Sequence, residues 1–105
     1  MRETGKNSVA VKVVYFGLVR NAVKKAEETV ELPAGSTVRD LVDVLCGRHG
    51  AALRDAILTA DGTPGSSVML LLDGTNILRR SGLDTAIVDD GSLHVLLTTT
   101  AMSGG

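Results

Sequence analysis

A capped amphipathic helix near the middle of the chain limits the architecture more than any other feature. Thr37 is followed three positions later by Asp40, the spacing of a capping box with Asp in place of the usual Glu. Apolar residues then recur at i, i+3, i+4 and i+7, namely Val38, Leu41, Val42 and Leu45. This pattern predicts a main helix over Thr37–Arg48. At about 1.5 Å per residue it is roughly 20 Å long, enough to cover one face of one small sheet.

The segments on either side of this helix are typical of strands. Val9–Gly17 is rich in β-branched and aromatic residues, and the alternating Glu28–Leu32 is expected to pair with it as a hairpin. Further strands are predicted at Val68–Gly74, which ends in an Asp-Gly turn, at 75–80 as a short edge strand, and at Leu93–Thr99. Between them lie a polar, basic connection with room for one helical turn at 18–27, a short helix at 51–58 and a loop at Thr59–Ser67. The order predicts an α+β fold, with the main helix packed on one face of a mixed sheet.

The first strand has two apolar faces. Its alternation places Val9, Val11, Val13 and Tyr15 together, and we expect this face and the run Val68–Leu72 to pack against the helix. Val14 and Phe16 lie on the opposite face, with Lys12. Two explanations stay open for them: the connection at Asn21–Lys25 covers them, or they form an apolar docking patch for a partner protein.

The composition is that of one ordinary globular domain. With 105 residues, we expect a flexible leader at 1–8, one domain at 9–99 and an extended tail at 100–105 that ends in Gly-Gly. A formal net charge of -1 argues against nucleic-acid binding and against an anionic membrane surface. No apolar run approaches the ~20 residues of a membrane span, and a single cysteine excludes an internal disulfide. A reducing cytoplasm is the expected location.

No residue cluster in the sequence predicts a catalytic or metal site. The neighbouring carboxylates at Glu27–Glu28 and Asp89–Asp90 are interpreted as solvated turn and edge residues. His49 is placed at a helix end and His94 on the exposed face of the last strand, and with Cys46 they lack the regular spacing of metal ligands.

Cys46 follows the apolar helix stripe near the helix C-terminus, which disfavours a thiolate, so it is interpreted as a small, partly buried apolar residue. No glycine-rich phosphate loop follows a strand. We therefore expect a protein that is not an enzyme.

The last residues, Thr98–Gly105, carry the remaining functional signal. Eight extended residues reach up to roughly 26–29 Å beyond the last strand. Glycines lack a Cβ, so Gly104 and Gly105 can pass through a narrow channel into the active site of another protein. A carboxylate delivered there can attack the α-phosphate of ATP. The alternative is an ordinary frayed end.

Four segments, in this order and spacing before the final Gly-Gly, carry a resemblance to a known family. They read VKVVYFG, VELPAGSTVRDLVDVL, LLDGTNI and GLDTAIVDDGSLHV. The chain resembles the β-grasp, ubiquitin-like sulfur carriers. These include the small subunit of molybdopterin synthase, the thiamine sulfur carrier, the small archaeal modifiers and the eukaryotic ubiquitin-related modifier. The threonine-rich segment before the glycines is most similar to that of the eukaryotic ubiquitin-related modifier.

The resemblance implies a β-grasp fold and a carrier without a bound cofactor or metal. It implies that an E1-like, ATP-dependent adenylyltransferase activates Gly105 and that a persulfide donor converts it to a thiocarboxylate, with Gly104 providing clearance. The thiocarboxylate would be presented to an enzyme that builds molybdopterin, a thiolated tRNA or another sulfur metabolite, with the large subunit of a synthase as a possible partner. An alternative is a protein modifier that forms isopeptide bonds between Gly105 and target lysines. A third is a non-covalent β-grasp interaction module.

Overall fold

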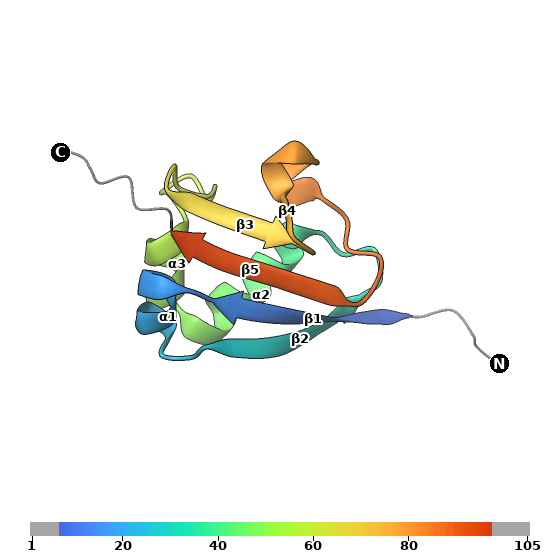
Figure 1. Cartoon of the computed structure of the whole chain (residues 1–105), viewed down its shortest axis with the longest axis horizontal. Coiled ribbons are helices and arrows are strands. Elements are labelled where there is room, and N and C mark those ends of the chain that lie inside the picture. Colours follow the sequence, from blue (N-terminus) through green and yellow to red (C-terminus); the bar gives the residue numbers. More distant parts are fainter. Residues whose placement is uncertain (1–6, 98–105) are drawn as a thin grey trace.

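Five strands form one mixed sheet in the computed structural model, which describes residues 7–97 (Figure 1). The strands are β1 (Ser8–Tyr15), β2 (Glu27–Pro33), β3 (Val68–Leu72), β4 (Thr75–Asn76) and β5 (Gly91–Leu97), in the order β2-β1-β5-β3-β4. The neighbours β1 and β5 run parallel, and every other pair is antiparallel. This confirms the predicted α+β class and the predicted hairpin of the first two strands. The predicted tail at 100–105 lies outside the described residues, and of the predicted leader only Asn7 and Ser8 lie within them.

Three α-helices pack on one face of this sheet (Figure 1). They are α1 (Gly17–Val23), α2 (Val38–His49) and α3 (Ala51–Ile57), and two short 3-10 helices, η1 (Ile77–Arg79) and η2 (Gly82–Asp84), follow β4. The main helix begins as predicted. Thr37 Oγ1 accepts a hydrogen bond from the Asp40 amide, and Asp40 Oδ2 accepts one from the Thr37 amide. Leu41 and Leu45 are fully buried in a single core that is built almost entirely from aliphatic side chains.

The connection after β1 is more ordered than the sequence indicated. The strand ends at Tyr15 rather than Gly17, and Gly17 adopts φ +57° to turn the chain into α1. Val19 and Val23, one helical turn apart, are buried, so this short helix packs an apolar face on the core. Lys24 ends it in the left-handed conformation. The polar residues between the two valines hid this face in the sequence pattern.

The strand predicted at 75–80 is only partly present. Asp73 and Gly74 form the predicted tight turn, and both have positive φ. β4 then stops after Asn76, because the Asn76 side chain accepts a hydrogen bond from the Leu78 amide and begins η1. The predicted loop at Thr59–Ser67 is confirmed, and a bridge between Leu58 and Pro64 ties it back to the end of α3.

Candidate functional site

The two terminal glycines, Gly104 and Gly105, lie outside the described residues. The structure describes the strand that leads toward them. β5 is paired on both sides, with β1 and with β3, and its last residue Leu97 lies opposite Val68. The segment that carries the glycines therefore begins at a central strand rather than at a sheet edge.

The sheet face opposite the helices carries an apolar area, here called the outer-face patch. In β1, β3 and β5 the residues that alternate with the core-facing ones point to this side. The patch consists of Val14, Phe16, Met69, Leu71, His94 and Leu96. Register places them in rows, since His94 is the partner of both Val14 and Leu71, while Leu96 is opposite Met69. The patch ends where β5 ends.

Phe16 and Val14, the two residues that the sequence singled out, both belong to this patch. Phe16 is 42% exposed, and its ring meets the His94 ring edge-on with centroids 5.4 Å apart. The segment Asn21–Lys25 therefore does not cover it fully. Phe16 follows the strand rather than lying within it, and its amide is held by the Val95 carbonyl. His94 lies on the predicted face but is half-buried, because the Phe16 ring packs against it.

Sequence reasoning missed the contribution of β3 to this patch. The sequence predicts that the whole run Val68–Leu72 packs against the helix, but Met69 and Leu71 are only half-buried. The helices pack on one face of the sheet, so the other face of β3 meets solvent. The sequence indicates this, because an unbroken apolar strand has two apolar faces and one principal predicted helix covers only one of them.

The structure corrects the exposure that the sequence predicts for Glu28. The sequence predicts a solvated edge residue, but the Glu28 side chain is 6% exposed and points to the helix side of β2. Tyr15 donates its hydroxyl hydrogen to Glu28 Oε2 at 2.5 Å, and His49 Nε2 lies 2.5 Å from the same oxygen. Arg48 donates to the other oxygen at 2.9 Å. The sequence holds one indication of this burial. Glu28 lies two residues before the buried Val30, so both side chains point to the same face of the strand.

These contacts keep the Glu28 carboxyl ionised. Burial alone raises the pKa of the Glu28 carboxyl, but hydrogen bonds from Tyr15, His49 and Arg48 outweigh burial and lower the pKa to about 2. Burial, followed by the hydrogen bond to Glu28, raises the pKa of the Tyr15 hydroxyl. Both carboxylate oxygens are occupied. The cluster therefore joins β1, β2 and the end of α2.

The remaining candidates for chemistry are inaccessible or dispersed. Cys46 is buried as predicted, and burial raises the pKa of its thiol although the nearby Arg54 opposes this. Among residues 7–97, no three His, Cys, Asp or Glu side chains are grouped so that they could hold a metal ion. In the same range, no helix is long and apolar enough to span a membrane.

Comparisons with known proteins fit this geometry. The sequence profile of the ThiS family matches residues 13–105. No curated protein matches the sequence. Among solved structures, small archaeal modifier protein 1 from Methanosarcina acetivorans is similar, with 25% identity over 95% of this chain and 100% of its own, and a TM-score of 0.74.

Two further structures show the same arrangement. One is a Pyrococcus furiosus protein assigned as subunit 1 of a molybdopterin converting factor, with 26% identity over 87% of this chain and 99% of its own and a TM-score of 0.66. The other is Urm1 from Trypanosoma brucei, with 15% identity over 95% of this chain and 99% of its own and a TM-score of 0.73. The last comparison concerns the fold alone. Together they show a β-grasp, ubiquitin-like fold.

Proposed function

Because this chain belongs to the ThiS family of ubiquitin-like sulfur carriers, we propose that its C-terminal carboxylate is the group that carries sulfur. In this proposal an E1-like enzyme adenylates Gly105, a persulfide donor converts it to a thiocarboxylate, and the protein delivers that sulfur to an acceptor. The observation that carries the proposal is that the family match runs through residue 105 and so includes both terminal glycines.

The chemistry requires activation from outside the chain. A carboxylate is a poor electrophile, because its oxygen is a poor leaving group. When it attacks the α-phosphate of ATP, pyrophosphate leaves and an acyl-adenylate forms. The terminal sulfur of a persulfide then displaces AMP, and a second thiol of the donor releases the thiocarboxylate as a disulfide forms.

The outer-face patch is the proposed docking surface for the activating enzyme. It is apolar, it is exposed at Phe16, and it ends where β5 ends, so a protein bound there would lie near the start of the tail. Phe16→Ser should weaken binding of the activating enzyme and leave the fold intact. Val88→Ser is the matched control, because Val88 is an exposed apolar residue outside the patch, at 63%. If both variants bind the activating enzyme equally well, Phe16 does not belong to the interface.

A second candidate is a protein modifier, in which a lysine amine displaces AMP and forms an isopeptide bond with Gly105. The similarity to a small archaeal modifier protein favours it. The two functions share activation and differ in the acceptor. Mass spectrometry of the protein from its native cell separates them. In a carrier, sulfur replaces oxygen at the terminal carboxylate, whereas in a modifier Gly105 is joined to a lysine side chain of a target protein.

The activation step is tested by deleting Gly105 and, separately, by Gly104→Val. Both changes should abolish ATP–pyrophosphate exchange with the cognate adenylating enzyme, because the first shortens the carboxylate's reach and the second adds a branched side chain to the segment that must enter the enzyme. Thermal unfolding should be unchanged. If the shortened protein is still adenylated, or the full-length protein never is, the carrier and modifier functions both fail and a non-covalent module remains.

A further inference from the structure

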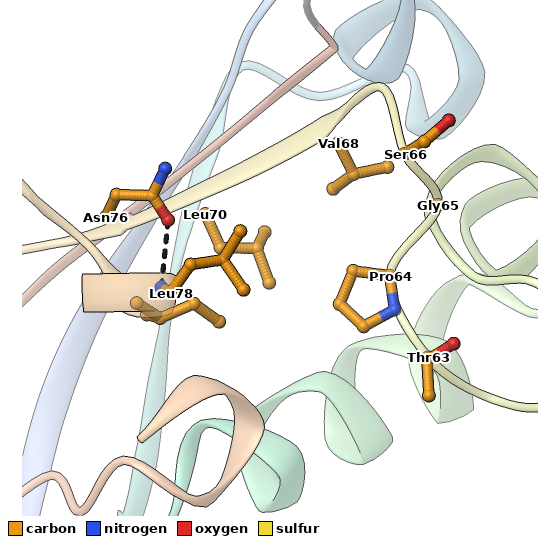
Figure 2. A pocket seen from close by; sticks show the side chains of 9 residues that line it. Thr63, Pro64, Gly65, Ser66, Val68, Leu70, Asn76 and Leu78 are labelled. Atoms are coloured by element: carbon orange, nitrogen blue, oxygen red, sulfur yellow. Dashed lines mark hydrogen bonds between the residues drawn. The ribbon is translucent and has the colours of Figure 1, made fainter. Parts of the chain in front are cut away.

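An apolar groove lies on the helix side of β3, away from the outer-face patch. Its volume is about 330 Å³. The groove is lined by Thr63, Pro64, Gly65, Ser66, Val68, Leu70, Asn76, Ile77 and Leu78. Figure 2 shows Leu78 on one side and Pro64 on the other, with Val68 and Leu70 directed from β3 into the space between them. Leu78 is 74% exposed and Val68 is half-buried, so the groove offers apolar surface to a further side chain.

The groove begins beside the point where the described residues end. Leu97, the last residue of β5, is paired with Val68, which lines the groove. Because strands lie about 4.8 Å apart and rise about 3.4 Å per residue, Leu97 is roughly 8 Å from Leu70 at the groove floor. Residues 98–105 follow Leu97, and Met102 is their only large apolar side chain. Five residues span up to roughly 17 Å, so the chain from Leu97 to Met102 is long enough to turn back past the start of β3 and reach the groove.

The side chains in and around the groove are complementary to this tail. Every lining side chain is uncharged, and methionine is unbranched and flexible, so it fills an irregular apolar space well. Arg79 and Arg80 directly follow Leu78, both are exposed, and neither forms an ion pair or hydrogen bond through its side chain with any residue the structure describes. The Gly105 carboxylate comes three residues after Met102, a span of up to roughly 10 Å. A tail whose methionine lies in the groove therefore brings its terminal negative charge within reach of these arginines.

We propose that the apolar groove holds the C-terminal tail of the same chain while the protein is free. Met102 enters the space between Pro64 and Leu78, and the Gly105 carboxylate meets Arg79. A short connection keeps the tail at an effective concentration on the order of millimolar near the groove, so a weak contact is sufficient to hold it. The held tail is a resting state of the free protein. It depends neither on adenylation of the terminus nor on the identity of the sulfur acceptor.

The test uses the full-length protein without ATP or any enzyme, labelled with ¹⁵N and with ¹³C at its methionine methyl groups. NMR should show nuclear Overhauser contacts between the Met102 methyl group and the methyl groups of Leu78. The order parameter of the Ser103 amide should fall at least twofold in Met102→Ser and equally in Leu78→Asp. Val88→Asp, at another exposed apolar position, should leave the tail held. Combining Met102→Ser with Leu78→Asp should cause no further loss, because both remove the same contact.

The contact of the carboxylate is tested separately. Arg79→Glu should lower the held fraction of the tail several-fold, and the difference from the natural protein should shrink at high salt, which screens exposed charges. Arg20→Glu is the matched control, because it makes the same change of charge at an exposed arginine of α1 that does not line the groove. Equal effects of the two substitutions would overturn the contact between Gly105 and Arg79.

Three results would overturn the proposal as a whole. The first is the absence of contacts between Met102 and Leu78, and the second is a Leu78→Asp variant in which the Ser103 amide is unchanged. The third is a mixture of differently labelled copies in which the contacts appear only between copies, because the tail of a second chain then occupies the groove. None of these results bears on adenylation of Gly105, so the proposed function is tested independently.

Discussion

Replacing Glu28 by Gln is expected to remove an acid-dependent part of the free energy of unfolding. An ordinary glutamate side chain has a pKa of 4.5, and hydrogen bonds from Tyr15, His49 and Arg48 lower that of Glu28 to about 2. Because each tenfold change in proton affinity corresponds to about 1.4 kcal/mol, the folded state gains about 3 kcal/mol from keeping this carboxyl ionised. The side chain is 6% exposed, so solvent screens the cluster little.

The sign follows from the direction of the shift. A carboxyl whose pKa is lower in the folded state stabilises the fold fully above pH 4.5, and this contribution is lost as the pH falls toward 2. Urea unfolding, followed by circular dichroism at pH 6, 4.5, 3 and 2, should show that the stability advantage of the natural protein over Glu28→Gln shrinks by about 3 kcal/mol across this window. All other carboxyl groups titrate in both proteins, so their contributions to the difference in unfolding free energy largely cancel.

Glu31→Gln is the matched control, because Glu31 lies in the same strand but on the exposed face. It should follow the natural protein within about 0.5 kcal/mol at every pH. The reasoning is refuted if the difference between the natural protein and Glu28→Gln stays constant from pH 6 to pH 2, or if Glu31→Gln changes the pH profile as much as Glu28→Gln does.

Two further predictions concern packing. Leu41→Ala should lower the free energy of unfolding by about 2–5 kcal/mol in denaturant titrations, because Leu41 is fully buried on the core face of α2; a loss below about 1 kcal/mol would contradict the packing described. Gly91→Ala should cost about 1–3 kcal/mol, since a Cβ there would lie 2.8 Å from Asp73 Oδ2 and would displace the carboxylate that accepts a hydrogen bond from Ser92. In an Asp73→Gly background the same change should cost much less, and additive effects of the two substitutions would argue against this contact.

Local patterns predicted most of the fold because each was reinforced by packing. The capping residues and the apolar stripe from Val38 to Leu45 defined α2 to within one residue. The alternation in β1 assigned its core face correctly, and the Asp73-Gly74 pair marked the turn between β3 and β4. In these segments local propensity and burial favour the same structure.

The missed features depend on contacts between distant parts of the chain. Helix α1 is stabilised by two buried valines against α3 and β5, which its polar sequence does not reveal. Glu28 is buried only because His49 and Arg48 arrive from the end of α2, about twenty residues later. The apolar groove between Pro64 and Leu78 needs the Thr59–Ser67 loop and η1 to lie close together beside β3, an arrangement that only the tertiary structure provides.

The placement of Cys46 is consistent with the proposed carrier chemistry. An acyl-adenylate or a persulfide reacts readily with an accessible thiolate, so an exposed cysteine on the carrier would compete with the intended donor or acceptor. The only cysteine of this chain, Cys46, lies within α2 and is buried, and burial raises the pKa of its thiol. Both effects lower the fraction of reactive thiolate at neutral pH. In the proposed chemistry, Cys46 would therefore not compete with the intended donor or acceptor.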